Sequence, residues 1–251
     1  VLFRSYKSIS MFIDRGDKIG LTGKNGVGKS TLLGLISKQI TPTEGTVIAE
    51  KGVSIGYLTQ DIEIRKDISA RAYIEQSNVE ITKIQNRLDF VNQELTNRTD
   101  YESDAYSELI EEVTDLNDRL TILDAHAIAE KIEQVLKGLG FKQTEFDNLI
   151  GSFSGGWQMR VELAKLLVNN PDVLLIDEPT NHLDIDTVSD AYIRRTPGLT
   201  ILSFFLLLIS QVLWLEHYLQ TEYRGTLLVV SHDQDFLSEV RSKTLFVVCN
   251  M

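Results

Sequence analysis

The feature that most restricts the fold of this chain is a glycine-rich stretch near its amino end. Residues 23–30 read Gly-Lys-Asn-Gly-Val-Gly-Lys-Ser, which matches the pattern G-x-x-x-x-G-K-[ST] in full. The residues before it alternate over 11–22 and end in the short run Lys18–Thr22, which is typical of a strand that leads into a glycine turn. Leucine and isoleucine then recur at helical spacing over 29–40. The sequence therefore predicts a strand, a glycine loop and a helix in direct succession, as in an α/β fold.

The residue types in this loop suit a phosphate group. Glycines let backbone N–H groups turn inward without a Cβ in the way, and the helix that follows points its positive end at the same place. Lys29 can reach the β- and γ-phosphates of a nucleotide, and the Ser30 hydroxyl can ligate Mg²⁺. The candidate nucleotide-binding residues are Gly23, Lys24, Asn25, Gly26, Val27, Gly28, Lys29, Ser30 and Thr31.

Further strands are expected downstream of the loop. A turn at 41–45 precedes two predicted short strands, at 46–49 and 53–58. Two continuous apolar runs, 173–176 and 226–230, suit parallel strands that are buried on both faces. The first run ends in Asp177 and Glu178, so we expect Asp177 to bind Mg²⁺ through water and Glu178 to polarise an attacking water.

The segment 61–137 has a different character. It holds 18 acidic and 9 basic residues, and it lacks both proline and glycine. Apolar residues recur at alternating spacings of three and four over 81–95 and again over 109–123, with a polar stretch at 97–104 between them. This pattern predicts an antiparallel helical hairpin that projects from the core. The alternative is two amphipathic helices packed flat on the core, but such helices usually show a wider apolar face.

Charge and cysteine usage exclude several classes of protein. The net charge of −11 argues against bulk electrostatic attraction to nucleic acid, although a local basic patch could still bind it. The one cysteine, Cys249, allows no internal disulfide, which fits a reducing compartment. No charged segment followed by an apolar run opens the chain, so we expect a cytoplasmic protein.

Three more motifs make the pattern specific. Ser154-Gly155-Gly156-Trp157-Gln158 opens a helical run, Pro-Thr-Asn-His-Leu-Asp follows Glu178, and Ser-His-Asp at 231–233 ends the last strong strand. Together with Gln60 after the strand near 55–58, they resemble an ATP-binding-cassette (ABC) ATPase. The Ser-Gly-Gly-Trp variant and the Pro-Thr-Asn-His-Leu-Asp string resemble the ABC-F subfamily, whose members have no transmembrane domain. The resemblance covers about residues 2–187 and 212–240.

This resemblance implies the following fold and domains. The fold class is α/β, a P-loop ABC-type nucleotide-binding domain with a helical subdomain and an antiparallel coiled-coil arm. Residues 1–64 and 139–251 would form the split ATPase core, and residues 65–138 the helical subdomain and arm. The chain would be a fragment, the first of two cassettes of a longer protein.

The resemblance also implies roles for individual residues. ATP and Mg²⁺ would be bound, with Ser30, Gln60 and Asp177 at the metal; the catalytic residues would be Glu178 as base, His232 at the γ-phosphate and Gln60 as a sensor of the attacking water. In the family, Ser154, Gly155 and Gly156 cap the nucleotide of a facing cassette. A second cassette and the ribosome would be partners, and no membrane contact is expected. Gln158 and Gln234 stand where the family usually has a basic residue.

The largest departure from the family lies at 188–211. These 24 residues separate two segments that the family joins almost directly, and their removal restores its pattern. We interpret them as a translated, unremoved intron. The codons for Val-Ser can contain a splice donor, those for a Phe/Leu/Ser-rich stretch can form a pyrimidine tract, and those for Ile-Ser-Gln can end in a splice acceptor. The alternative is a membrane span at 199–215. That stretch is about 17 residues long, short of the usual 20 or so, and it contains serines and a glutamine.

Three functional classes remain to be distinguished. The first is an ABC-F-type ATPase with two closing nucleotide sites. The second is a fragment that binds nucleotide without hydrolysing it, because its partner cassette is missing. The third is a DNA-repair or chromosome-type ABC ATPase, against which the short hairpin argues, since those proteins carry much longer coiled coils.

Overall fold

The computed structural model describes residues 10–24, 26–59, 62–179, 201–240 and 243–246. Strands and helices alternate on either side of a long run of helices, α2 to α6, that separates β2 from β3. The strands are β1 (Lys18–Thr22), β2 (Ile55–Leu58), β3 (Val173–Asp177), β4 (Thr226–Val230) and β5 (Lys243–Phe246). The helices are α1 (Lys29–Ile36), α2 (Ala70–Glu75), α3 (Val79–Asn97), α4 (Asp104–Ile122), α5 (Ala125–Gly138), α6 (Gly155–Asn169), α8 (Ile201–His217) and α9 (Gln234–Val240). The described residues also form the short 3₁₀ turns η1 (Gln143–Glu145) and η2 (Ile150–Ser152) and the π-helical turn η4 (Tyr218–Glu222).

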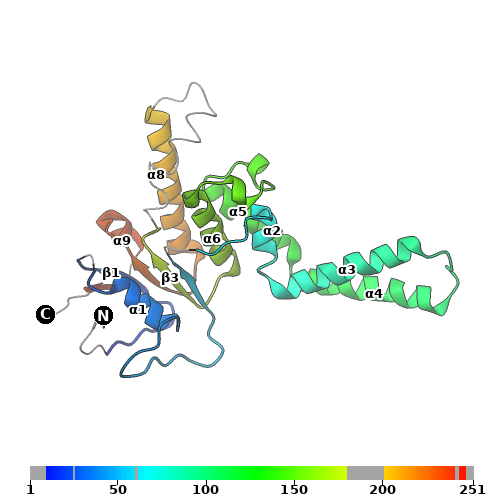
Figure 1. The fold of residues 1–251 in the computed structure, drawn as a ribbon, viewed down its shortest axis with the longest axis horizontal. Coiled ribbons are helices and arrows are strands. Elements are labelled where there is room, and N and C mark those ends of the chain that lie inside the picture. The colour runs from blue at the N-terminus through cyan, green and yellow to red at the C-terminus, as the bar shows by residue number, and fades with distance from the viewer. Residues whose placement is uncertain (1–9, 25, 60–61, 180–200, 241–242, 247–251) are drawn as a thin grey trace.

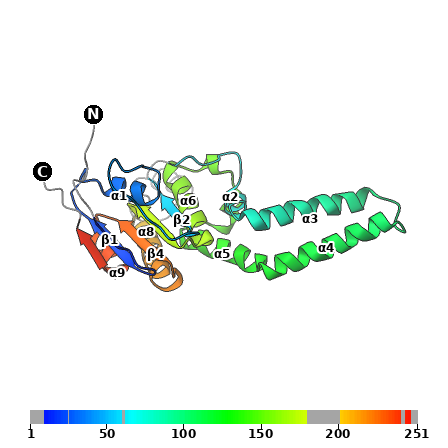
Figure 2. The ribbon, with the colours of Figure 1, turned by 90° about the horizontal axis from the view of Figure 1, so that it is seen from below.

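A parallel sheet forms the centre of the core. Its order is β2-β3-β4-β1-β5, and every neighbouring pair is parallel (Figure 1, Figure 2). Leu174 of β3 packs in an apolar cluster with α5 and α6, whereas the next residue, Leu175, packs in a second cluster with α1. Because successive side chains of a strand point to opposite faces, helices cover both faces of this sheet. The two buried apolar runs predicted as parallel strands are confirmed.

Two predicted strands differ from the structure. The first begins only at Lys18, because the chain turns at Gly16 (φ +83°) and the N–H of Asp17 donates to the carbonyl of Asp14 at 3.2 Å. No strand forms at 46–49: Ile48 is 89% exposed, and these residues join no ladder among the described strands. A strand needs a neighbour for its backbone groups and a face to bury, and this segment has neither. The prediction at 53–58 corresponds to β2.

The helix after the glycine loop is also shorter than its apolar spacing predicted. It ends at Ile36, and Lys38 adopts a left-handed conformation (φ +62°). The N–H of Ile40 then donates to the carbonyl of Gly34 at 3.0 Å, and the Ile40 side chain packs over the Cα of Gly34. Ile40 therefore continues the apolar pattern from a turn that folds back on the helix, not from the helix itself.

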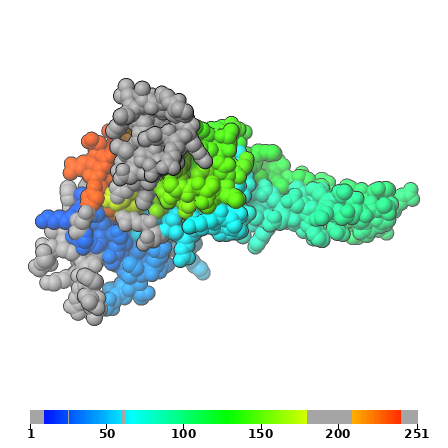
Figure 3. Space-filling model, turned by 45° about the horizontal axis from the view of Figure 1, so that its top comes forward, coloured from blue at the N-terminus to red at the C-terminus, as the bar shows by residue number. Residues whose placement is uncertain are grey.

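The acidic segment forms a two-helix arm, α3 and α4, that extends away from the core (Figure 1, Figure 3). The helices run side by side in opposite directions in both ribbon views (Figure 2). Their facing residues include the fully buried Val91 of α3 and the buried Leu116 of α4. Arg87 and Glu112 join the helices with two hydrogen bonds of 2.6 and 2.9 Å. The two helices and the polar turn are thus as predicted; the coiled-coil supertwist stays a prediction.

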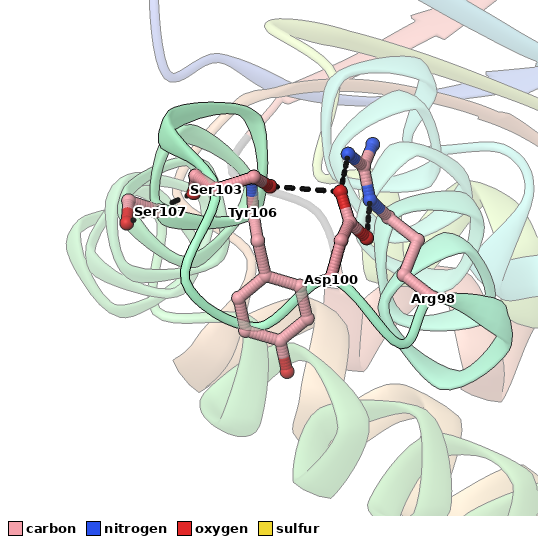
Figure 4. Close-up of polar contacts among 5 residues, drawn as sticks. All are labelled: Arg98, Asp100, Ser103, Tyr106 and Ser107. Atoms are coloured by element: carbon pink, nitrogen blue, oxygen red, sulfur yellow. Dashed lines mark hydrogen bonds and ion pairs between the residues drawn. The ribbon is translucent and has the colours of Figure 1, made fainter.

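Side-chain hydrogen bonds fix the turn at the tip of the arm. The Asp100 carboxylate accepts from both Nε and Nη2 of Arg98 and from the Ser103 hydroxyl at 2.8 Å (Figure 4). Ser103 caps α4, since its hydroxyl accepts from the N–H of Tyr106 at 3.1 Å. The chain therefore reverses between the two helices by a specific set of polar contacts.

The segment around the proposed insertion is only partly described. Residues 188–200 lie outside the described residues, but α8 runs without a break from Ile201, inside the 188–211 segment, to His217 beyond it. The helix therefore continues past the segment into the residues after 211, where the resemblance to the family resumes. Among the described residues, no helix is both long and apolar enough to cross a membrane.

Candidate functional site

The sheet topology brings three loops to one edge. β3, β4 and β1 are adjacent, and their carboxyl ends are level: Asp177 pairs with Val230, which pairs with Leu21. The glycine loop follows β1, Glu178 follows β3, and Ser231 and His232 follow β4. Ligands of open parallel sheets bind outside this edge, so the motifs predicted separately from the sequence converge at one place.

The glycine loop folds around its own lysine. Gly26 and Gly28 have φ of +76° and +106°, a left-handed conformation that other residues rarely adopt. Gly28 caps α1, so the helix begins directly at Lys29. Lys29 is 7% exposed, and its ammonium donates to the carbonyl of Gly23 at 2.8 Å and to that of Lys24 at 3.3 Å. A loop of this shape places an ammonium and the N-terminus of α1 beside each other, which suits a phosphate.

The acidic pair at the end of β3 is buried. Asp177 and Glu178 are 2% and 5% exposed. Glu178 has a φ of +54°, which is uncommon for a residue with a side chain, and its N–H donates to the carbonyl of Val230 at 2.9 Å. This conformation puts the Glu178 carboxylate against the loop after β4. Backbone strain at one residue is a frequent mark of a functional position.

Glu178 and His232 face each other. The backbone N–H of His232 donates to Oε2 of Glu178 at 3.3 Å, and Nε2 of His232 lies 3.4 Å from Oε1. Burial, and to a lesser extent the charge of Asp177, raise the pKa of the Glu178 carboxyl against the opposite effects of the His232 N–H, its imidazole and Lys29. A carboxylate whose pKa is raised in this way, beside an exposed histidine, can accept a proton from a water molecule.

The charge of Asp177 also affects Tyr57, a residue that was not predicted from the sequence to lie near the site. Burial, and then the charge of Asp177, raise the pKa of the Tyr57 hydroxyl to about 12. Tyr57 belongs to β2, the neighbour of β3 in the sheet. The only sequence signal for it was its place three residues before Gln60 in a predicted strand.

The Ser-Gly-Gly segment opens α6. Ser154 is the N-cap, and both Ser154 and Gly155 are exposed, whereas Gly156 is buried. A Cβ at Gly155 would meet no atom within 4 Å. The helix start is held by Trp157, whose ring lies 4.7 Å from that of Phe141. The positive end of a 15-residue helix is therefore presented to solvent by a segment without bulky side chains.

The remaining predicted site residues are placed as follows. Ser30 lies exposed in the first turn of α1. Gln60, Asn25 and the loop that contains Asp184 lie outside the described residues. Gln158, one of the departures from the family pattern, donates from its side-chain amide to the carbonyl of Phe153 at 2.8 Å, so it braces the turn before α6.

Comparison with known proteins agrees with this geometry. The profile of the family described as "ABC transporter" matches residues 6–181. The chain belongs to this family. It is 33% identical over 247 residues to ABC transporter F family member 5 of Arabidopsis thaliana, which covers 96% of this chain and 32% of that protein. It is 34% identical over 241 residues to the probable ATP-binding protein YheS of Haemophilus influenzae, with the same coverages. This ABC chain thus matches F-subfamily proteins, and it spans about a third of their length.

Solved structures show the same fold. The dimeric MJ0796 cassette in a post-hydrolysis state bound to ADP and Pi aligns with a TM-score of 0.57 at 19% identity, over 96% of this ABC chain and 85% of that one. The archaeal ribosome recycling factor aABCE1, in complex with the ribosomal stalk protein aP1, aligns with a TM-score of 0.53 at 21% identity, over 93% and 32%. The predicted fold class, a P-loop ABC nucleotide-binding domain, is confirmed.

Proposed function

We propose that this ABC cassette hydrolyses ATP in a head-to-tail pair with a second cassette. The observation that carries the proposal is the buried Glu178 carboxylate, held 3.3 Å from the His232 N–H at the same sheet edge as the Lys29 loop. Glycine-loop amides and the Lys29 ammonium would bind the phosphates. Glu178 would take a proton from the attacking water, and His232 would contact the γ-phosphate.

The residues present fit a magnesium ion. Ser30 and Asp177 offer a hydroxyl and a carboxylate, the hard oxygen donors that Mg²⁺ prefers, and Gln60 would add an amide oxygen. Among the described residues, no three His, Cys, Asp or Glu side chains are close enough to hold a metal ion by themselves. This agrees with the usual Mg²⁺ site in such proteins, where one or two protein oxygens act together with substrate phosphates. When bound, Mg²⁺ would neutralise charge on the phosphates.

The exposed start of α6 supports the need for a second cassette. Ser154, Gly155 and the N–H groups behind them would cap a nucleotide held by the partner and exclude water from it. The shortness of this chain relative to its relatives fits the same proposal, since those proteins have room for another cassette.

We infer that the working partner is the ribosome, and that the protein acts in translation in the cytoplasm. The support is the match to F-subfamily proteins, together with the fold shared with a factor crystallised in complex with a ribosomal stalk protein. The projecting α3–α4 arm supplies a feature by which a cassette could reach a large partner.

The decisive experiment compares Glu178→Gln with Lys29→Ala. Glu178→Gln should retain Mg²⁺-dependent ATP binding, lose turnover, dimerise with ATP and sediment with ribosomes. Lys29→Ala should bind ATP much more weakly and should neither dimerise with ATP nor sediment with ribosomes at the same ATP concentration. Equal loss of ATP binding in both variants would contradict the assigned roles. Binding without turnover in the unmodified chain would favour the non-hydrolysing fragment instead.

We also infer that 188–211 is foreign to the working cassette. The last residue of the segment, Gln211, is buried, and neither of its amide atoms has a hydrogen-bond partner in the part of the chain that the structure describes. Sequencing the cDNA across codon 188 tests the origin: a message shorter by 72 nucleotides would support a retained intron, and a genomic sequence without splice dinucleotides would refute it. A chain without 188–211 should bind ATP at least as well as the full chain.

A further inference from the structure

A buried arginine lies behind the exposed start of α6. Arg160 is only 1% exposed, although arginine is seldom fully buried in proteins. Its guanidinium lies 4.3 Å from the centre of the Trp157 ring, so the side chain reaches back along the helix toward the N-terminus. Trp157 belongs to the first turn of α6 and directly follows Gly156. The positive charge of Arg160 is therefore held next to the Ser-Gly-Gly segment.

The contacts of Arg160 include two rigid groups. The first is the Trp157 ring, which is itself fixed, because it meets the ring of Phe141 edge-on at 4.7 Å and stacks on that of Phe153 at 6.5 Å. The second is the carbonyl of Leu139, the C-cap of α5, to which Nη1 of Arg160 donates at 3.4 Å. The guanidinium thus keeps one position relative to the start of α6.

Neither packing nor helix stability explains a charge at this position. Burial lowers the pKa of Arg160 to about 10, so the side chain stays charged at pH 7. Taking a charge out of water costs free energy, and an apolar side chain could fill the same space without that cost. A cation near the N-terminus of a helix also opposes the helix dipole. What the charge does supply is a positive potential at Ser154 and Gly155, which adds to that of the helix end.

We propose that Arg160 is a positioning residue that adds positive charge to the Ser-Gly-Gly segment, for the phosphates of the ATP that the partner cassette holds. This role rests on the proposed pairing of two cassettes. The guanidinium is too deeply buried to touch a phosphate itself, so it acts through the first turn of α6: it holds Trp157 in place and makes the surroundings of the backbone N–H groups more positive. In a site from which water is excluded, such a fixed charge acts strongly on an approaching anion.

The test uses a thiol to measure the potential at the segment. Ser154→Cys is made in a chain that also carries Cys249→Ser, so that the introduced thiol is the only one. Its pKa is read from the pH dependence of its alkylation by iodoacetamide in low-salt buffer, and we expect a value below the usual pKa of about 8.5. Adding Arg160→Gln should raise this pKa by about 0.5–1 pH unit, the size expected for the loss of one nearby charge that water partly screens.

Two further variants separate the charge of Arg160 from its packing. Arg160→Lys keeps the charge but loses the planar guanidinium, and it should restore the low pKa of the thiol. Lys131→Met is the matched control, because it removes the same charge from a partly buried side chain at the other end of α6, where the Lys131 ammonium donates to the carbonyl of Val168 at 3.1 Å. It should leave the thiol pKa unchanged.

The link to ATP is tested in the Glu178→Gln background, with native Ser154. There Arg160→Gln should need roughly three- to tenfold more ATP to dimerise, while a fluorescent ATP analogue binds to the single cassette with the same affinity. An unchanged thiol pKa or an equal ATP requirement would overturn the proposal; if Arg160→Gln does not fold, Arg160→Met serves as the second neutral variant. If Glu178→Gln alone forms no dimer with ATP, the proposed function fails and the role toward ATP with it, whereas the thiol still decides whether Arg160 charges the segment.

Discussion

Replacing Gln211 by methionine should stabilise the protein. The Gln211 side chain is 2% exposed, and among the described residues neither its oxygen nor its nitrogen has a hydrogen-bond partner. It packs directly over Gly140, where a Cβ would lie 2.2 Å from the Gln211 nitrogen. Gly140 has a φ of +94° after α5, so this approach of α8 depends on the missing side chain. The buried amide has thus lost its hydrogen bonds to water, and no hydrogen bond to the described residues replaces them.

The size of the effect follows from that burial. An amide buried without hydrogen bonds costs about 1–3 kcal/mol in protein mutational data. Methionine has a similar length, is unbranched and carries no polar group that needs a partner, so it can fill the same space. We therefore expect the free energy of unfolding to rise by about 1–3 kcal/mol. With a urea m-value of about 3 kcal/mol/M, the midpoint should rise by roughly 0.3–1 M.

Equilibrium urea unfolding, followed by tryptophan fluorescence, measures this midpoint. Gln220→Met is the matched control, because Gln220 is exposed and its amide is hydrogen-bonded to Glu239. The control should leave the midpoint unchanged or lower it. A midpoint for Gln211→Met that does not exceed that of the unmodified chain would refute the argument that the buried amide is unsatisfied.

Three other outcomes are expected. Lys29→Ala should weaken binding of a fluorescent ATP analogue by about 10- to 100-fold, because a charge-assisted contact to phosphate is lost; an unchanged affinity would remove Lys29 from the site. Glu178→Gln should unfold at higher urea than the unmodified chain at pH 7. Folding raises the pKa of Glu178, so the ionised carboxylate destabilises the folded state. This destabilisation is absent below the pKa of the unfolded state and develops as pH rises through the pKa of the folded state, so the stability gained by Glu178→Gln should vanish toward about pH 4. A gain in stability that is independent of pH would contradict this argument. Leu116→Ala should cost the hairpin about 2–5 kcal/mol and speed amide hydrogen exchange in α3 and α4, while ATP affinity stays the same; unaltered exchange there would mean that the seam does not hold the arm.

The parts of the fold that could be predicted depend on local spacing. The glycine loop, the apolar run before Asp177 and the two arm helices each occupy a short continuous stretch with its own periodicity. The convergence of Glu178 and His232 was also accessible, because both follow buried runs that had to be parallel strands.

The parts that could not be predicted depend on distant neighbours. The apolar residues near Ile48 favoured a strand, but a strand also needs a ladder partner, which no local pattern supplies. The left-handed backbone of Glu178 and the burial of Gln211 arise from packing against residues far along the chain.

The arm and the start of α6 belong to one packed unit, and this links their proposed roles. α2, which leads into the arm, packs against α6 in the larger apolar cluster. The Tyr73 hydroxyl of α2 donates to Glu162 at 2.7 Å and accepts from Lys165 at 3.0 Å, and these two charged residues of α6 pair with each other. Since both are largely buried, the contacts hold α2 in one position on α6. A partner that binds the arm and displaces α2 must therefore also break these contacts or move α6, the helix that begins beside Ser154 and Gly155.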